Sequence, residues 1–180
     1  MYTPIREALW TGTTNVFQRL GKTPLIIHSH GNGETPTGSY VVIYLLSVDQ
    51  TGRVFESTVT DGVVSGSEKF THQQSFYNIN VQFSFYGPEA GALGTLFYNH
   101  VNNNRMSRWE WNVNGLSPRS KSNLRYNPQR LDAEWKDAFN MDVTFSCTVH
   151  EKVSIDWIEH IGVKANGQET VYIPPLPPTT

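Results

Sequence analysis

The sequence predicts an α+β protein built on a single antiparallel or mixed β-sheet that two helices flank. Two stretches, at 75–87 and 141–149, alternate between apolar and polar residues, as strands do when one face is buried and the other is wet. Two further stretches, at 3–20 and 88–101, repeat apolar residues with helical spacing. Strands with one wet face are typical of antiparallel sheets, so these observations together favour the α+β class.

The composition agrees with this fold class and limits the function. The charged fraction of 17% lies below the usual quarter, and Gly, Asn, Ser and Thr fill the gap, as in proteins rich in strands and loops. The formal net charge is −2 and there is no run of Lys or Arg, which argues against sequence-specific nucleic-acid binding. Cys147 is the only cysteine, which excludes a disulfide scaffold and favours an intracellular origin. No apolar run approaches the roughly 18 residues of a membrane helix, so no membrane partner is expected.

The first helix is expected over residues 3–20. Thr3 suits the N-cap and Pro4 suits the first helical position. The TGTTN stretch in the middle is poor helix material, so we expect a break near Gly12. Gly21 is expected to end the helix.

Two strands are expected next, at 24–30 and 39–48, on either side of a loop rich in Gly, Pro and Asn. Residues 49–69 are polar and punctuated by glycine, which indicates a loop or a hairpin. The alternating strand at 75–87 follows, and it leads into the helix at 88–101.

The second half of the chain is expected to continue the sheet. Trp109, Trp111 and Val113 alternate and suggest a short strand, with the two tryptophans on one face. The long alternating strand at 141–149 follows, and residues 154–163 form a third strand whose two faces are both partly apolar.

The chain is expected to divide into an α+β domain at 1–165 and an extended arm at 166–180. The ending IPPLPPTT holds four of the ten prolines. A segment of this kind cannot form a helix interior or a central strand, so an extended proline-rich arm is the natural interpretation.

The stretch IHSHGNGETPTGSY poses the question of a metal site. In a strand, His28 and His30 point to the same face, and Glu34 could supply a third ligand, as in the first motif of the cupin family. A cupin needs a fourth ligand from a later glycine-containing motif. The other histidines lie in a polar loop, in a helix or at strand edges without such a motif: His72, His100, His150 and His160. We therefore favour a loop without a metal or other cofactor, and a cupin-like metal enzyme is the alternative.

The tryptophan-rich and basic stretches between residues 105 and 125 allow two interpretations. Trp109 and Trp111 beside arginines could stack on bases, but the overall charge favours a core edge or a subunit contact. The stretch PRSKSNLR, at 118–125, is either a solvated loop or a non-specific contact to DNA.

Two stretches taken together resemble a known family. VQFSFYGPEAGALGTLFYNHV is a strand, a Tyr-Gly corner and an apolar helix, and LDAEWKDAFNMDVTFSCTVHEKVSIDWIEHIGV follows some forty residues later. Their order is similar to that in the neck terminators of tailed phages, head–tail completion proteins related in architecture to tail terminators. The resemblance covers roughly residues 3–164, and it implies a tail-terminator-like fold.

The resemblance also implies a structural virion protein and not an enzyme. Such a protein assembles in the host cytoplasm as a ring, expected to be a hexamer, between the head-completion or adaptor proteins and the tail tube. It would complete the DNA channel, touch DNA without sequence preference, and bind tube and possibly sheath proteins. Another minor tail or baseplate component is a further alternative, because a fold alone does not fix a position in the particle.

The expected contact residues come from the aromatic stretch, the basic stretch, the loop tip and the proline-rich arm. They are Trp109, Trp111, Arg119, Lys121, Asn32, Pro174 and Pro175.

Overall fold

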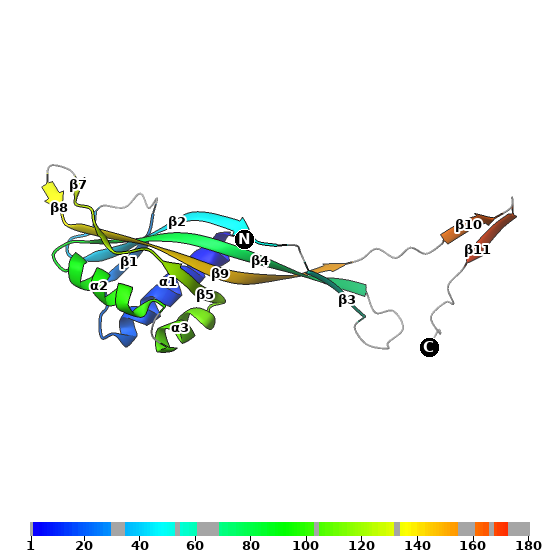
Figure 1. The fold of residues 1–180 in the computed structure, drawn as a ribbon, viewed down its shortest axis with the longest axis horizontal. Coiled ribbons are helices and arrows are strands. Elements are labelled where there is room, and N and C mark those ends of the chain that lie inside the picture. Colours follow the sequence, from blue (N-terminus) through cyan, green and yellow to red (C-terminus); the bar gives the residue numbers. More distant parts are fainter. Residues whose placement is uncertain are drawn as a thin grey trace. The chain divides into compact units, whose positions relative to one another are not determined.

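A computed structural model describes residues 2–29, 35–52, 55–60, 69–102, 105–131, 134–154, 161–165 and 168–172 (Figure 1). Its elements, in chain order, are α1 (Tyr2–Arg19), β1 (Leu25–His28), β2 (Tyr40–Gln50), β3 (Phe55–Thr60), β4 (Lys69–Tyr86), α2 (Ala90–His100), α3 (Arg105–Asn112), β5 (Leu116–Lys121), β6 (Arg125–Tyr126), β7 (Gln129–Leu131), β8 (Glu134–Lys136), β9 (Ala138–Ser154), β10 (Ile161–Ala165) and β11 (Gln168–Tyr172). The predicted α+β class is confirmed, with three helices in place of the expected two.

The main sheet is mixed, and its central order is β1-β2-β4-β9-β5. β1 runs parallel to β2, whereas β2 and β4, and β5 and β9, pair antiparallel. β3 pairs with β4 and β6 pairs with β9, which brings the sheet to seven strands. β7 with β8, and β10 with β11, form separate two-stranded sheets.

The chain forms two compact units. The first comprises Met1–Thr51 and Phe76–Thr148, and it holds all three helices. The second comprises Gly52–Ser75 and Val149–Thr180. Most of the described side chains lie in the first unit, so the interpretation below concerns that unit.

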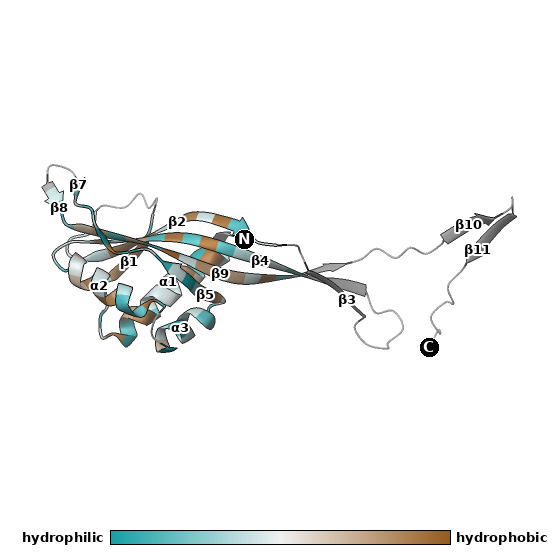
Figure 2. Ribbon diagram, viewed as in Figure 1, coloured by the Kyte–Doolittle hydropathy of each residue, from teal (hydrophilic) through white to brown (hydrophobic). Residues whose placement is uncertain are grey.

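The alternating strands bury one face, as predicted. In β4, Ile79, Val81, Phe83 and Phe85 are completely buried, and the residues between them face the other side of the sheet. β9 repeats the pattern with Met141, Val143 and Phe145. Figure 2 shows the resulting alternation of hydrophobic and hydrophilic residues along the strands, and Figure 1 shows α1, α2 and α3 together on one face of the sheet.

A β-bulge in β2 keeps the strand in phase with this core. Leu45 pairs with Val81, but the next pair is Ser47 with Asn80, so Leu46 is an extra residue in β2. Leu46 is accordingly exposed, and Val48 packs against the core beyond it. The bulge also turns Ser47 to the same face as Asn80, which matters for the surface described below.

The expected break in the first helix is wrong, because α1 continues through Gly12 to Arg19. The hydroxyl of Thr13 donates to the Leu9 carbonyl at 2.7 Å, and that of Thr14 donates to the Trp10 carbonyl at 2.8 Å, so both threonines bond within the helix. Gly12 allows the indole ring of Trp111 to lie directly against the helix backbone. Tertiary packing therefore overrides the weak helix propensity of this stretch.

The expected strand at Trp109, Trp111 and Val113 is also wrong, because this segment forms α3. The Trp-Glu-Trp alternation imitates a strand, but helical spacing places Ser107, Glu110 and Trp111 on the buried side. Trp111 is fully buried, whereas Trp109 is 62% exposed on the opposite side of the helix.

Part of the predicted third strand and the end of the arm lie outside the described residues. Residues 155–160, which include Trp157, belong to this group, as do residues 173–180. β10 and β11 form an antiparallel pair. Ile161 pairs with Tyr172 at one end, and Ala165 pairs with Gln168 at the other.

Candidate interaction surfaces

The sheet face opposite the helices carries a network of polar side chains that crosses β2, β4 and β9. The Ser47 hydroxyl donates to the Asp49 carboxylate at 2.7 Å and accepts from the Asn80 amide at 2.9 Å. The Asn80 carbonyl oxygen in turn accepts from the Thr144 hydroxyl at 2.9 Å. We call this network, together with Gln82 and Asp142, the polar ladder.

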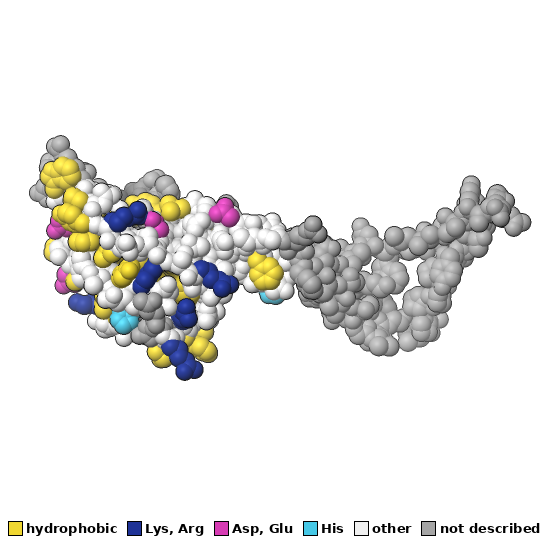
Figure 3. All heavy atoms as spheres, viewed as in Figure 1, with side chains coloured by type: hydrophobic (Ala, Val, Ile, Leu, Met, Phe, Trp, Pro, Cys, Tyr) yellow, Lys and Arg dark blue, Asp and Glu magenta, His cyan; other side chains and the backbone are white. Residues whose placement is uncertain are grey.

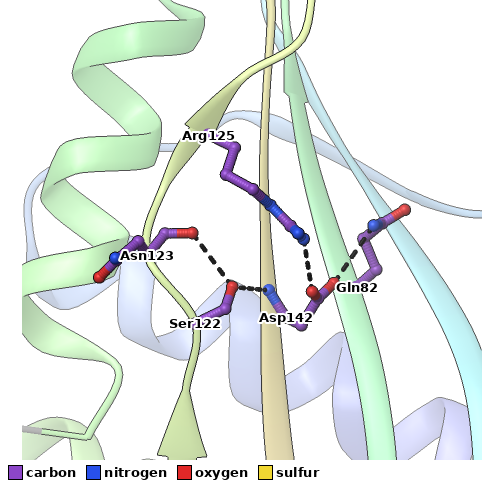
Figure 4. Close-up of polar contacts among 5 residues, drawn as sticks. All are labelled: Gln82, Ser122, Asn123, Arg125 and Asp142. Atoms are coloured by element: carbon purple, nitrogen blue, oxygen red, sulfur yellow. Dashed lines mark hydrogen bonds and ion pairs between the residues drawn. The ribbon is translucent and has the colours of Figure 1, made fainter.

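Asp142 is the centre of the second half of the polar ladder (Figure 4). Its carboxylate accepts a hydrogen bond from the Gln82 amide at 3.2 Å and pairs with the Arg125 guanidinium. Its backbone N–H donates to the Ser122 hydroxyl at 2.8 Å, and that hydroxyl donates to the Asn123 carbonyl at 3.1 Å. Side chains from β4 and β6 thereby converge on the Asp142 carboxylate, and Ser122 holds its backbone, which makes this region a rigid, hydrophilic surface.

Another part of the same sheet face is apolar. Tyr40 and Tyr86 stack with their ring centroids 5.0 Å apart, and Val42 and Ala138 are buried beside them. The Tyr86 hydroxyl donates to the Gln129 side-chain carbonyl at 3.0 Å, and burial raises the pKa of Tyr86 above its usual value. The rings are thus structural packing and do not supply an ionised phenolate.

Helix α3 presents an apolar stripe on its outer side. Met106, Trp109 and Val113 are 52%, 62% and 57% exposed, and their spacing of three and four residues puts them on one side of the helix. Arg105 and Arg108 are exposed beside them. Figure 3 shows Lys and Arg side chains among hydrophobic ones in the region of α3 and β5. We call Met106, Trp109 and Val113, with the two arginines, the α3 outer face.

An ion pair holds α3 to the end of α1. The Arg19 guanidinium donates to the Glu110 carboxylate, whose side chain is only 9% exposed, whereas that of Arg19 is 44% exposed. Asn114 secures the following turn through a 2.7 Å bond from its amide to the Glu110 backbone carbonyl. The pair fixes the orientation of α3 and therefore of its outer face.

Removing Arg19 should destabilise the protein more than removing an exposed cation does. Arg19→Ala leaves the nearly buried Glu110 carboxylate without its partner, so we expect a loss of about 1–2 kcal/mol in the free energy of unfolding. The matched control is Lys22→Ala, because Lys22 and Glu89 form an exposed pair at 3.6 Å that should contribute under about 1 kcal/mol. Urea unfolding of both variants, and of Arg19→Ala combined with Glu110→Gln, would test this. Equal losses for the two single variants would contradict the expectation.

The structure places the expected contact residues in different environments. Trp109 lies on the α3 outer face, but Trp111 lies in the core, where its ring is 4.7 Å from that of Phe145. On β5, the Arg119 guanidinium donates to the Ser146 hydroxyl at 2.8 Å and remains exposed. Lys121 lies 3.9 Å from the centre of the Tyr98 ring, and burial lowers the pKa of its amine. Asn32, Pro174 and Pro175 lie outside the described residues.

The histidine stretch does not supply a metal centre in the described part of the chain. His28 ends β1 and is partly buried, and burial, followed by the positive charge of Arg6, lowers its pKa. His30 and Glu34 lie outside the described residues. Among the residues that the structure describes, no three His, Cys, Asp or Glu side chains gather where they could hold a metal ion.

Both edges of the main sheet in the first unit carry features that hinder pairing with another strand. At β1, the Trp10 indole N–H donates to the Ile26 carbonyl at 3.2 Å and thus occupies an edge acceptor. At β5, Pro118 has no N–H to offer, and the pairing with β9 shifts register between Pro118 and Ser120. Natural sheets protect their edges in these ways. Contacts to other proteins are therefore expected to use side-chain surfaces.

Comparison with known proteins identifies the family. None of the helices that the structure describes has the length and apolarity to cross a membrane. No curated protein matches the chain. The family model described as phage neck terminator protein matches residues 2–170. Since this match covers nearly the whole sequence, the chain belongs to the phage neck terminator family and is a structural protein of the phage neck, a virion component that interacts with other head or tail proteins.

Proposed function

We propose that this protein forms a homo-oligomeric ring, a hexamer, that joins the head-completion proteins to the tail tube and completes the DNA channel between them. The observation that carries this proposal is the family match over residues 2–170. The ring binds tube proteins, and sheath proteins where these are present, and it performs no catalysis. Its assembly takes place in the host cytoplasm.

The chemistry of the described surfaces supports a role without catalysis. The two carboxylates of the polar ladder, Asp49 and Asp142, are engaged by neighbouring side chains of the same face. Cys147 lies on the core face of β9, and burial raises the pKa of its thiol, which disfavours a nucleophilic thiolate. These groups stabilise the sheet, and a reactive group would need to be free to meet a substrate.

The overall charge supports a channel through which DNA slides. A protein that neutralises many phosphates gains affinity for DNA through counterion release. A chain with a net charge of −2 and no run of basic residues has little of this affinity. Its contact with DNA is therefore non-specific and weak.

The ring is expected to appear as a defined particle. Light scattering coupled to size exclusion should give a mass of about six times the 20.4 kDa subunit for the protein alone, or for protein eluted from purified tails to which it has bound. Tail preparations without added protein serve as the control. A protein that remains a 20.4 kDa monomer and never joins a tail particle would contradict the proposal.

A further inference from the structure

The α3 outer face combines exposed apolar side chains with positive charge. Trp109 lies in the middle of its apolar stripe and is 62% exposed, and Arg105 and Arg108 are exposed beside it. The acid of this helix, Glu110, points to the buried side, where it pairs with Arg19. Tryptophan and arginine are the side chains that most often dominate protein–protein contacts. A partner that fits this face therefore offers aromatic side chains together with a carboxylate that can accept from the arginines.

A second surface of the first unit has this composition. Trp135 on β8 is 72% exposed, and Tyr126 on β6 is 59% exposed. The Tyr126 hydroxyl donates to the exposed Asp137 carboxylate at 2.8 Å, and Asp137 follows Trp135 by two residues. Lys136 stands between them in the chain, but side chains of an extended segment alternate, so it points away from Trp135. We call Tyr126, Trp135 and Asp137 the Trp135 patch.

The Trp135 patch is held in place before any partner binds. The Tyr126 ring packs against the Phe139 ring with centroids 5.1 Å apart, and the Gly87 backbone N–H donates to the Asp137 carbonyl at 3.3 Å. A carboxylate has about four acceptor sites, so the bond from Tyr126 leaves the Asp137 carboxylate able to accept from an arginine. The α3 outer face is likewise fixed by the ion pair of its helix with Arg19. Contacts between such preformed surfaces cost little ordering of side chains.

The two surfaces lie apart on the first unit, as a ring requires. Figure 1 shows α3 and the β7–β8 pair well separated, and Figure 3 shows hydrophobic side chains in both regions. A closed ring needs two different patches on each subunit, one for each neighbour. Two α3 outer faces would repel one another through their arginines, whereas the Trp135 patch offers the opposite charge. We propose that, in the ring proposed above and resting on it, the α3 outer face of one copy docks on the Trp135 patch of the next.

The test compares the self-association of full-length variants by sedimentation velocity over a range of concentrations. Trp109→Ala and Trp135→Ala should each weaken self-association at least ten-fold. Leu46→Ser is the matched control, because Leu46 is a 56% exposed apolar side chain outside both surfaces, and it should leave self-association unchanged. An equal mixture of the two tryptophan variants retains one natural contact, so it should stop at a pair of about twice the 20.4 kDa subunit. Where the natural protein assembles only on purified tails, the mass of the protein eluted from them replaces the solution measurement.

Exchange of charge between the two surfaces tests their direct contact. Arg108→Glu places an acid opposite Asp137, and Asp137→Arg places a cation opposite the arginines of α3, so each change alone should weaken assembly at least ten-fold. The chain that carries both changes presents opposite charges again, and it should recover most of the natural assembly. A role confined to folding would show no such recovery. Thermal unfolding of each variant confirms that it is folded before its assembly is measured.

The outcomes separate this contact from the proposed ring. If the natural protein assembles and Trp109→Ala and Trp135→Ala assemble equally well, the contact is wrong and the ring stands. A doubly charge-exchanged chain that assembles no better than the single variants, or a loss with Leu46→Ser equal to that with the tryptophan variants, also overturns the contact alone. A natural protein that stays a 20.4 kDa monomer with and without tails overturns both proposals.

Discussion

Gly12→Ala is expected to lower the free energy of unfolding by about 2–3 kcal/mol, the cost of overpacking a closely packed site. A β-carbon at position 12 would lie 2.4 Å from two ring carbons of Trp111, far inside van der Waals contact. In an unhindered helix the same change gains up to about 1 kcal/mol. A destabilising effect of Gly12→Ala would therefore indicate that Trp111 packs against Gly12, and a stabilising effect would indicate that it does not.

Urea unfolding with a double-mutant cycle would measure the Gly12 effect. Gly91→Ala is the control, because its β-carbon would lie 3.2 Å from the edge of the Phe139 ring, so a small shift suffices and the loss should be smaller. In the Trp111→Leu background, Gly12→Ala should cost less, since the smaller side chain leaves room. A stabilising effect in the natural background would show that the two helices do not pack this closely.

The close approach matters because Trp111 links the helices to the sheet. Its ring lies 4.7 Å from that of Phe145 on β9, and 6.5 Å and 6.4 Å from those of Phe83 on β4 and Phe97 on α2. Displacing the indole would thus disturb the packing of three elements and not of α3 alone.

Gly87→Ala is expected to cost about 3 kcal/mol. Gly87 has a φ of +93°, a conformation that costs other residues roughly 1–2 kcal/mol. A β-carbon there would also lie 2.3 Å from the Gly38 carbonyl oxygen and 2.9 Å from the Ser39 Cα, both backbone atoms that cannot rotate away. The substitution would therefore force apart β4, the start of α2 and the approach to β2.

Gly115→Ala separates the two contributions to the Gly87 effect. Gly115 has a φ of +75°, but nothing lies within 4 Å of a β-carbon built there. It should show only the conformational cost of about 1–2 kcal/mol. Thermal or urea unfolding of both variants would measure the difference, and equal losses would mean that the contact with Gly38 contributes nothing.

The long strands could be predicted because the alternation of apolar and polar residues along a strand indicates which of its faces is buried. The strands around Val81 and Phe145 needed no knowledge of the rest of the fold. In α1, Gly12 packs against Trp111, which lies far along the chain, and no local sequence pattern indicates that contact. The segment around Trp109 was wrongly predicted as a strand, because two tryptophans two residues apart would lie on one face of a strand. In the helix that forms instead, Trp111 is buried and Trp109 is exposed.

The interaction surfaces were less accessible to prediction than the fold. Alternation predicts a wet face, but the hydrogen bonds of the polar ladder depend on register, and the bulge at Leu46 decides which β2 residues meet Asn80. The ion pair between Arg19 and Glu110 could not be predicted, because nothing in the sequence links these two positions. Of the expected contact residues that the structure describes, Trp109 lies on an exposed apolar surface, whereas Trp111 belongs to the core.

The protected edges of the main sheet in the first unit have a consequence for solubility at high concentration. Open strand edges would let copies of the protein pair edge to edge and polymerise into fibres. With Trp10 covering the Ile26 carbonyl and Pro118 interrupting the opposite edge, that irreversible route is hindered. In the proposed ring, copies would therefore meet through side chains, and such contacts can separate again more readily than a continued sheet.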